Sequence, residues 1–244
     1  MPRGIPGFGP NAKAAKTARQ QTNGATVVIG TPGTLTGVAE QAGDGDAFIQ
    51  TQQPFRVAIT IEGTAPLLCH RYSVESVAEK ATMKKGSEGK KMDDVESYIY
   101  RDHDGFICLP GKYLKGALVE AAKFKQDPRS PRKSAKDLVR ASVIPLTNLA
   151  QLIPIGSKGK PTKAWDGLDT QRVRVQQSAV SRTRPIFHEG WKASFVLMVS
   201  LPEYVTPALL RQILNDAGRL VGVGDFRPDY GRFEVVSWEV LGDD

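Results

Sequence analysis

Glycine, arginine and aromatic side chains are combined between Asp216 and Val235 in a way that suits a polyanion. Glycine permits positive φ and a close approach of another chain. Arginine offers a fork of donors that matches phosphate oxygens, and an aromatic face can stack on a base. The candidate contacts are Gly222, Gly224, Phe226, Arg227, Tyr230 and Arg232. A tight helix-to-strand turn with solvated arginines is the alternative interpretation.

Two lysines lie at the start of a predicted helix over residues 112–124, which carries small and apolar side chains at helical spacing. Lys112 and Lys115 fall in its first turn, where the helix dipole disfavours cations unless an anion lies there too. Both are therefore candidate phosphate contacts. Two merely exposed lysines are the alternative, since they would cost only roughly tenths of a kcal/mol.

The positive charge of the chain is concentrated in two segments. Residues 123–140 and 156–184 each hold seven basic and two acidic side chains, on a chain of net charge +7. In the second segment arginine alternates with valine, which predicts a strand with arginines on one face or a hairpin arm leaning out of the domain. Its candidate contacts are Arg172, Arg174, Arg182 and Arg184. Solvated loop charge is the alternative.

His70 is the candidate for catalysis. Metal-free RNA cleavage needs a base for the 2′-hydroxyl proton and an acid for the leaving oxygen. The chain has no second histidine near His70, and the loop over residues 66–72 contains no aspartate. A histidine packed at a strand end is the favoured interpretation, so we expect a protein that is not an enzyme.

The sequence predicts neither a metal nor a nucleotide cofactor. Cys69, Cys108 and His188 lack metal-ligand spacing. The turn from Gly222 to Gly224 follows a predicted helix, whereas phosphate-binding and dinucleotide-binding loops follow a strand. Two cysteines are too few for a disulfide scaffold and favour a reducing compartment. Without a long apolar run or a signal-peptide core, a cytoplasmic protein with no membrane partner is expected.

The pattern of the chain predicts one α+β domain over residues 51–244, preceded by an arm. Residues 1–50 are rich in Gly, Ala, Thr and Gln, and we expect them to be flexible or ordered by assembly. The expected order is strand, helix, strand, strand, helix, strand, which is typical of a ferredoxin-like four-stranded antiparallel sheet with helices on one face. Long inserts fall at about 73–104 and 125–190. The expected elements cover residues 55–62, 112–124, 142–153, 191–199, 207–220 and 232–240.

Two stretches are similar to a known superfamily. Residues 109–119 resemble the proline-glycine-x-x-leucine-lysine-glycine opening of the first helix in RAMP proteins, the RNA-recognition-fold (RRM-like) proteins of CRISPR effector complexes. Residues 221–233 resemble the glycine-rich loop of these proteins, which ends in arginine and a Gly-aromatic-Gly turn before the last strand. The similarity is to the repeating backbone subunits. Residues 1–50 depart from the family pattern.

The resemblance implies a subunit that oligomerises as a filament along single-stranded guide RNA. RNA would be favoured over DNA, and copies of the chain and other effector subunits would be its partners. Residues 156–184 would be the thumb, a hairpin that reaches over the neighbour's RNA segment. Three alternatives stay open: a phage-type single-stranded DNA binding or annealing protein, a metal-free endoribonuclease using His70, and a phage structural protein.

Overall fold

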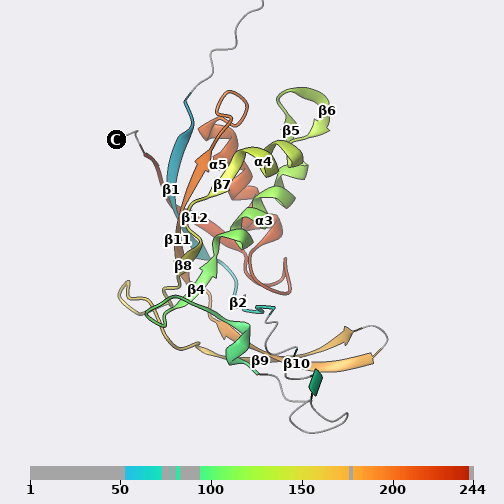
Figure 1. The fold of residues 1–244 in the computed structure, drawn as a ribbon, viewed down its shortest axis with the longest axis vertical. Coiled ribbons are helices and arrows are strands. Elements are labelled where there is room, and N and C mark those ends of the chain that lie inside the picture. The colour runs from blue at the N-terminus through green and yellow to red at the C-terminus, as the bar shows by residue number, and fades with distance from the viewer. Residues whose placement is uncertain (1–52, 73–77, 79–80, 83–93, 176–177, 242–244) are drawn as a thin grey trace, which may run out of the picture. The chain divides into compact units, whose positions relative to one another are not determined.

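The computed structural model describes residues 53–72, 78, 81–82, 94–175 and 178–241, with the side chains of residues 173–180 left out (Figure 1). The expected arm over residues 1–50 and most of the insert over residues 73–104 therefore lie outside the described residues. In the described part, no helix is long and apolar enough to cross a membrane.

A four-stranded antiparallel sheet organises the domain, with the spatial order β12–β1–β11–β7. Its strands are β1 (Phe55–Gly63), β7 (Val143–Pro145), β11 (Lys192–Val199) and β12 (Phe233–Leu241). Period-two alternation in β1 buries Val57, Ile59 and Ile61 against the core, as the sequence predicted. Pro145 falls in an edge strand, which is the position that tolerates a missing donor.

Three helices cover one face of this sheet (Figure 1). They are α3 (Gly111–Ala121), α4 (Lys136–Ser142) and α5 (Pro207–Asp216). Helix α5 begins where expected, because the Thr206 hydroxyl accepts a hydrogen bond from the Leu209 amide and Pro207 occupies the first turn. A π-helical turn, η3 (Ala217–Val221), continues it to Gly222. A 3₁₀ turn, η2 (Ala122–Phe124), continues α3.

The predicted α+β fold is present, with the strand and helix order expected from the sequence. The single extended segment expected over residues 142–153 is wrong in detail. It divides into β7, in the main sheet, and β8 (Leu149–Gln151), in another sheet. Strand β8 pairs with one edge of β4 (Ile107–Pro110), and β3 (Tyr100–Arg101) pairs with the other edge. A 3₁₀ turn, η1 (Glu96–Tyr98), precedes β3.

The first basic segment forms a small hairpin and a helix. Strands β5 (Gln126–Asp127) and β6 (Ser130–Ser134) pair around Pro128 and Pro131, which disfavour a helix, and α4 then follows unpredicted. Asp127, which is 4% exposed, accepts both backbone and guanidinium hydrogen bonds from Arg129. Part of the basic charge in this segment is thus compensated within the hairpin.

The second basic segment forms a long antiparallel hairpin of β9 (Gly167–Val175) and β10 (Ser178–Phe187) (Figure 1). It begins and ends later than the thumb expected over residues 156–184. The base of β10 pairs with a short strand, β2 (Leu67–Leu68), which follows β1 and Pro66. This pairing fixes the base of the hairpin beside the loop that carries His70.

Candidate nucleic-acid interface

The loop from Gly222 to Gly231, called here the glycine loop, is folded onto the segment that follows β1. The Gly231 amide donates to the Pro66 carbonyl at 2.7 Å, and the Asp225 amide donates to the Leu68 carbonyl at 3.0 Å. The Val223 amide donates to the Gly231 carbonyl at 2.8 Å and closes the loop on itself. The loop is therefore a docked element of the domain.

The glycines of this loop are required by the fold of the protein itself. Gly224 has a φ of +83°, and a Cβ there would lie 2.6 Å from the Leu68 carbonyl oxygen. Gly222 has a φ of +76°, and a Cβ at Gly231 would meet the Val223 carbonyl. Any other residue would be strained in these conformations. The close approach predicted from the glycines is thus made, at these positions, by the protein's own backbone.

The two aromatic residues of the glycine loop are fixed to the hairpin. The Arg184 guanidinium of β10 lies over the Phe226 ring at 4.4 Å from its centroid. The Tyr230 hydroxyl accepts a hydrogen bond from the Gln171 amide of β9 at 2.8 Å. The two rings lie 6.4 Å apart at a tilt of 56°. Sequence reasoning placed both as candidate stacking surfaces, and the structure holds them at the base of the hairpin.

Arg184 is buried and ion-paired, so its guanidinium is engaged inside the protein. It is 5% exposed, and its Nε lies 2.6 Å from an oxygen of Asp225. Among the described residues, its Nη1 has no hydrogen-bond partner. The Asp225 carboxylate faces Arg184 and His70.

His70 faces the same oxygen of Asp225 as Arg184 does. Its Nδ1 is 3.4 Å from the Asp225 carboxylate, and its ring makes an edge contact with Tyr98 at 4.7 Å. Burial acts to raise the pKa of Asp225, but the hydrogen bond from His70 and the charge of Arg184 outweigh it and lower that pKa below its ordinary value. The carboxylate therefore stays charged between the Arg184 guanidinium and the His70 imidazole.

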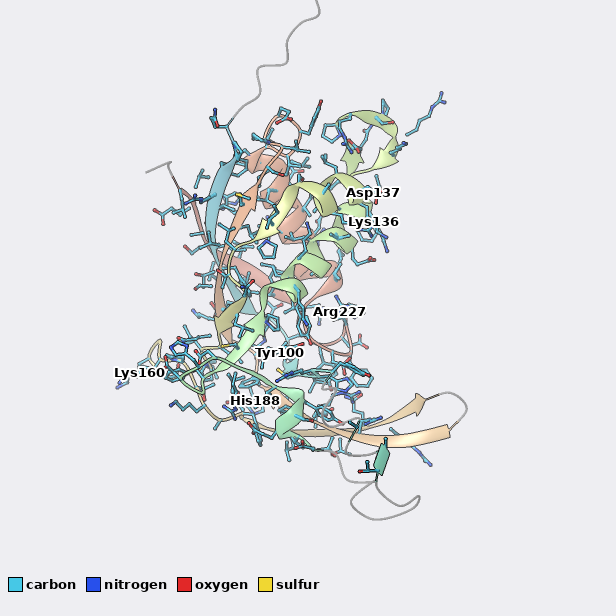
Figure 2. The ribbon with its side chains drawn as sticks, in the orientation of Figure 1. Tyr100, Lys136, Asp137, Lys160, His188 and Arg227 are labelled. Carbon is cyan, nitrogen blue, oxygen red and sulfur yellow. The ribbon has the colours of Figure 1, made fainter. Side chains whose placement is uncertain are left out.

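A hollow of about 180 Å³ opens beside this cluster, and we call it the cation hollow. It is lined by His70, Lys112, Tyr113, Gly116, Gly224, Asp225 and Arg227. Three segments far apart in the sequence thus bring four predicted site residues together: His70, Lys112, Gly224 and Arg227. Figure 2 shows Arg227 beside α3.

The floor of the cation hollow includes a glycine in the middle of α3. A Cβ at Gly116 would meet no atom within 4 Å, so packing does not require glycine there. Glycine in a helix interior costs about 0.5–1 kcal/mol relative to alanine. What Gly116 provides is access to the helix backbone from the hollow.

Lys112 and Lys115 have different surroundings although both lie in the first turns of α3. The Lys112 ammonium lies 5.0 Å from the centroid of the Tyr100 ring and lines the cation hollow. The Lys115 ammonium donates to the backbone carbonyls of Val139, Arg140 and Val143 at the end of α4. Burial, and then the charge of Arg140, lower the pKa of Lys115 to about 8. Lys115 is therefore placed as a cap for α4.

The remaining predicted arginines whose side chains the structure describes do not line the cation hollow. Arg172 is exposed on β9, and Arg182 of β10 donates to the Tyr98 hydroxyl at 3.1 Å. Arg232 is exposed and lines a separate hollow with Arg219. Arg174 is part of β9, but its side chain lies outside the described residues.

Sequence reasoning missed the tyrosines around the hollow. Tyr98 and Tyr100 belong to the insert expected at about 73–104, and Tyr113 follows Lys112 directly. Tyr100 and Tyr113 meet edge to face at 5.9 Å, and Arg71 lies 5.3 Å from the centroid of Tyr100. Tyr98 ends η1 and Tyr100 begins β3, so no strand period could have marked both residues.

The described residues hold no group of three or more His, Cys, Asp or Glu side chains that could bind a metal ion. Cys69 and Cys108 are free thiols in the interior, and burial is the main cause that raises their pKa values to about 12 and about 11. Neither thiol is placed to act as a thiolate ligand at neutral pH.

Comparison with known proteins gives matches among solved structures only. No protein-family model matches the chain, and no curated protein matches it. A chain in the cryo-EM structure of the Type III-B Cmr-beta complex bound to cognate target RNA is similar at 12% identity and a TM-score of 0.46. The match covers 78% of this chain and 61% of that chain.

The crystal structure of Cmr6 from Pyrococcus furiosus is similar at 11% identity and a TM-score of 0.41. The match covers 75% of this chain and 98% of Cmr6.

Proposed function

We propose that this chain binds single-stranded nucleic acid, RNA in preference to DNA, and that copies of it line a guide RNA as a backbone subunit. The cation hollow and the β9–β10 hairpin would be its binding surfaces, and other effector subunits and copies of the chain its partners in the cytoplasm. The observation that carries this proposal is the convergence of Lys112, Arg227 and His70 over the open backbone of Gly116.

The charge of the cation hollow favours an anion. Of the described residues that line it, Asp225 alone carries a carboxylate, and this charge is compensated by Arg184 at 2.6 Å. Lys112 and Arg227 therefore leave the hollow net positive. Helix α3 adds to this field, since its first turn holds no acidic residue and its N-cap, Pro110, makes no side-chain cap. A phosphodiester carries the negative charge that both the hollow and the start of α3 favour.

The open face of the main sheet is less suited to RNA. On β1 it presents Arg56, Ala58, Thr60 and Glu62, of which Thr60 bonds to Ser194 at 2.9 Å and Glu62 pairs with a lysine of β11. RNA-recognition modules that use this face stack bases on aromatic side chains, and β1 presents none there, because Phe55 lies on the core side with Val57 and Ile59. The hollow beside the glycine loop is the better candidate.

The test is a Lys112→Ala plus Arg227→Ala variant, measured against short single-stranded RNA and DNA across a salt series. Both side chains reach the cation hollow and neither is buried. The variant should lose affinity at low salt, and the log–log salt slope should fall by about 0.7 for each phosphate contact removed.

The matched control is Lys160→Ala, an exposed lysine that lies apart from Arg227 (Figure 2). It removes a positive charge of the chain without touching the hollow. If the double variant binds as tightly as the Lys160→Ala control, nucleic-acid binding at this site is refuted.

The guide-RNA part of the proposal has its own measurement. Absorbance at 260 nm of the purified protein, followed by digestion with RNase or DNase and sizing of the extracted strand, should give RNA of uniform length. Extraction of DNA would favour a single-stranded DNA-binding protein instead.

A second candidate function, metal-free RNA cleavage, is favoured by the His70–Asp225 pair. A carboxylate at Nδ1 orients an imidazole so that its Nε2 can accept a proton. Lys112 and Arg227 line the same hollow and could stabilise charge on the reacting phosphate. Incubation of labelled RNA in EDTA with wild type and with His70→Gln tests this, and equal cutting by both would exclude His70.

A further inference from the structure

A second hollow lies on the other side of Arg227, and its lining differs sharply from that of the cation hollow. It has a volume of about 560 Å³, and its apolar walls come from Phe124, Leu220, Val221, Phe226 and Pro228. We call it the aromatic groove. Phe124 is 65% exposed and Leu220 is 42% exposed, so two large apolar side chains face solvent here. Within the described residues, nothing covers them.

The two hollows share a wall. Gly224, Asp225 and Arg227 line both the cation hollow and the aromatic groove. A positively charged polar hollow and an apolar aromatic one therefore adjoin across a single stretch of the glycine loop. A nucleotide unit has the matching composition, since its phosphate is charged and its base is flat and largely apolar on both faces.

We propose that the aromatic groove holds an unpaired nucleobase of the strand whose phosphate lies in the cation hollow. This inference rests on the proposed function and adds a base-binding site to it. Phe124 provides an exposed ring, and Phe226 of the glycine loop provides a second one. The Arg184 guanidinium covers the Phe226 ring at 4.4 Å and fixes its position.

The acidic side chains of the groove do not oppose a nucleic acid. Glu120 is ion-paired with Lys123 and lies 3.8 Å from the Lys136 ammonium. Asp225 is ion-paired with Arg184. Arg227 is left as the exposed cation between the two hollows. This charge pattern favours a nucleotide over an apolar peptide segment, which would gain nothing from Arg227.

The site should not select one base over another. Stacking on a phenylalanine ring is open to every base, because each has a π-face. The apolar side chains of the groove offer no donor or acceptor that could read a base edge. A subunit that binds a guide of variable sequence requires this tolerance.

The experiment compares two oligonucleotides of about a dozen nucleotides. One is an ordinary single-stranded RNA, and the other has the same backbone with abasic sugars, so that it keeps the phosphates and loses the bases. Their dissociation constants are measured for wild type, Phe124→Ala, Arg227→Ala and Ile155→Ala. Ile155 is 62% exposed, lies outside both hollows and serves as the matched apolar control.

Wild type and Ile155→Ala should bind the ordinary strand about tenfold more tightly than the abasic strand, in line with the stacking of one base. Phe124→Ala should reduce this ratio to near one while leaving the abasic affinity unchanged. A Phe124→Trp variant, which keeps an aromatic ring at this position, should keep the tenfold ratio. Arg227→Ala should weaken binding of both strands, because it removes a phosphate contact.

Each other outcome has a distinct meaning. If Phe124→Ala keeps the tenfold ratio, the base site is refuted and the proposed function stands. If Phe124→Ala leaves both affinities unchanged but shifts the mass in light scattering, the groove is a protein contact and the inference fails. If wild type binds neither strand, the proposed function fails and the inference fails with it.

Discussion

Arg184 of β10 and Asp225 of the glycine loop form an ion pair at 2.6 Å, with the arginine almost fully buried. The pair connects the base of the hairpin to the loop that precedes β12. The same guanidinium covers Phe226, and the same carboxylate faces His70. Through these contacts the hairpin, the glycine loop and the His70 segment are held as one unit.

Replacing one residue of this pair should destabilise the domain. Replacing both should destabilise it by less than the sum of the two single effects. Arg184→Met leaves a carboxylate facing only His70, and Asp225→Asn leaves a buried guanidinium without its counter-charge. Each should lower the free energy of unfolding by about 2–3 kcal/mol, less than for a fully buried pair because Asp225 is partly exposed. A double-mutant cycle in urea should give a coupling energy of about 1 kcal/mol or more. Additive losses would show that the pair does not act as a unit.

Asp225 should also make the stability of the domain depend on acid pH. Its pKa in the folded protein lies below its ordinary value of 3.8, so the folded state binds this proton less tightly than the unfolded chain. The stabilisation is complete above the unfolded value and is lost as the pH falls through the folded one. Urea unfolding of wild type and Asp225→Asn should therefore differ near neutral pH and converge in acid. A constant difference down to the lowest pH at which the protein folds would contradict this assignment.

The two lysines at the start of α3 should differ in their effects, because Lys115 supports the stability of the domain and Lys112 supports RNA binding. Lys115→Met removes the donor of three backbone carbonyls at the end of α4 and should destabilise the domain by about 2 kcal/mol. Lys112→Met removes an exposed cation of the hollow and should change stability by less than about 0.5 kcal/mol. The order should be reversed for affinity, with Lys112→Met weakening RNA binding more than Lys115→Met. Chemical denaturation and RNA titration of both variants decide the matter.

The core elements could be predicted because their signals are local. Alternation of apolar side chains gave β1, and Thr206 followed by Pro207 gave the start of α5. The division of residues 142–153 could not be predicted, since β7 and β8 differ only in which partner strand each one meets. Apolar residues recur along the whole segment and fit either sheet, so tertiary pairing decides between them.

The site could be predicted in part, and the limit has a physical cause. Residue type identified Lys112 and Arg227 as cations, but it could not separate Lys112 from Lys115, whose partners come from α4. It also could not place Arg184, because burial of an arginine depends on a carboxylate from another segment. Phe124 was named only as the end of a helix, and its exposure follows from the 3₁₀ turn that ends α3.

Two glycines of the cation hollow should respond to the same substitution in opposite directions. Gly224→Ala places a methyl group 2.6 Å from the Leu68 carbonyl oxygen at a φ of +83°. The domain should therefore lose stability, and the glycine loop should no longer dock on the segment that follows β1. Gly116→Ala meets open space in a helix interior, so it should gain up to about 1 kcal/mol. If a strand uses the helix backbone at Gly116, the more stable variant should bind RNA several-fold more weakly. Thermal denaturation and RNA titration of the two variants test this, and undiminished RNA binding by Gly116→Ala would show that the strand does not reach α3.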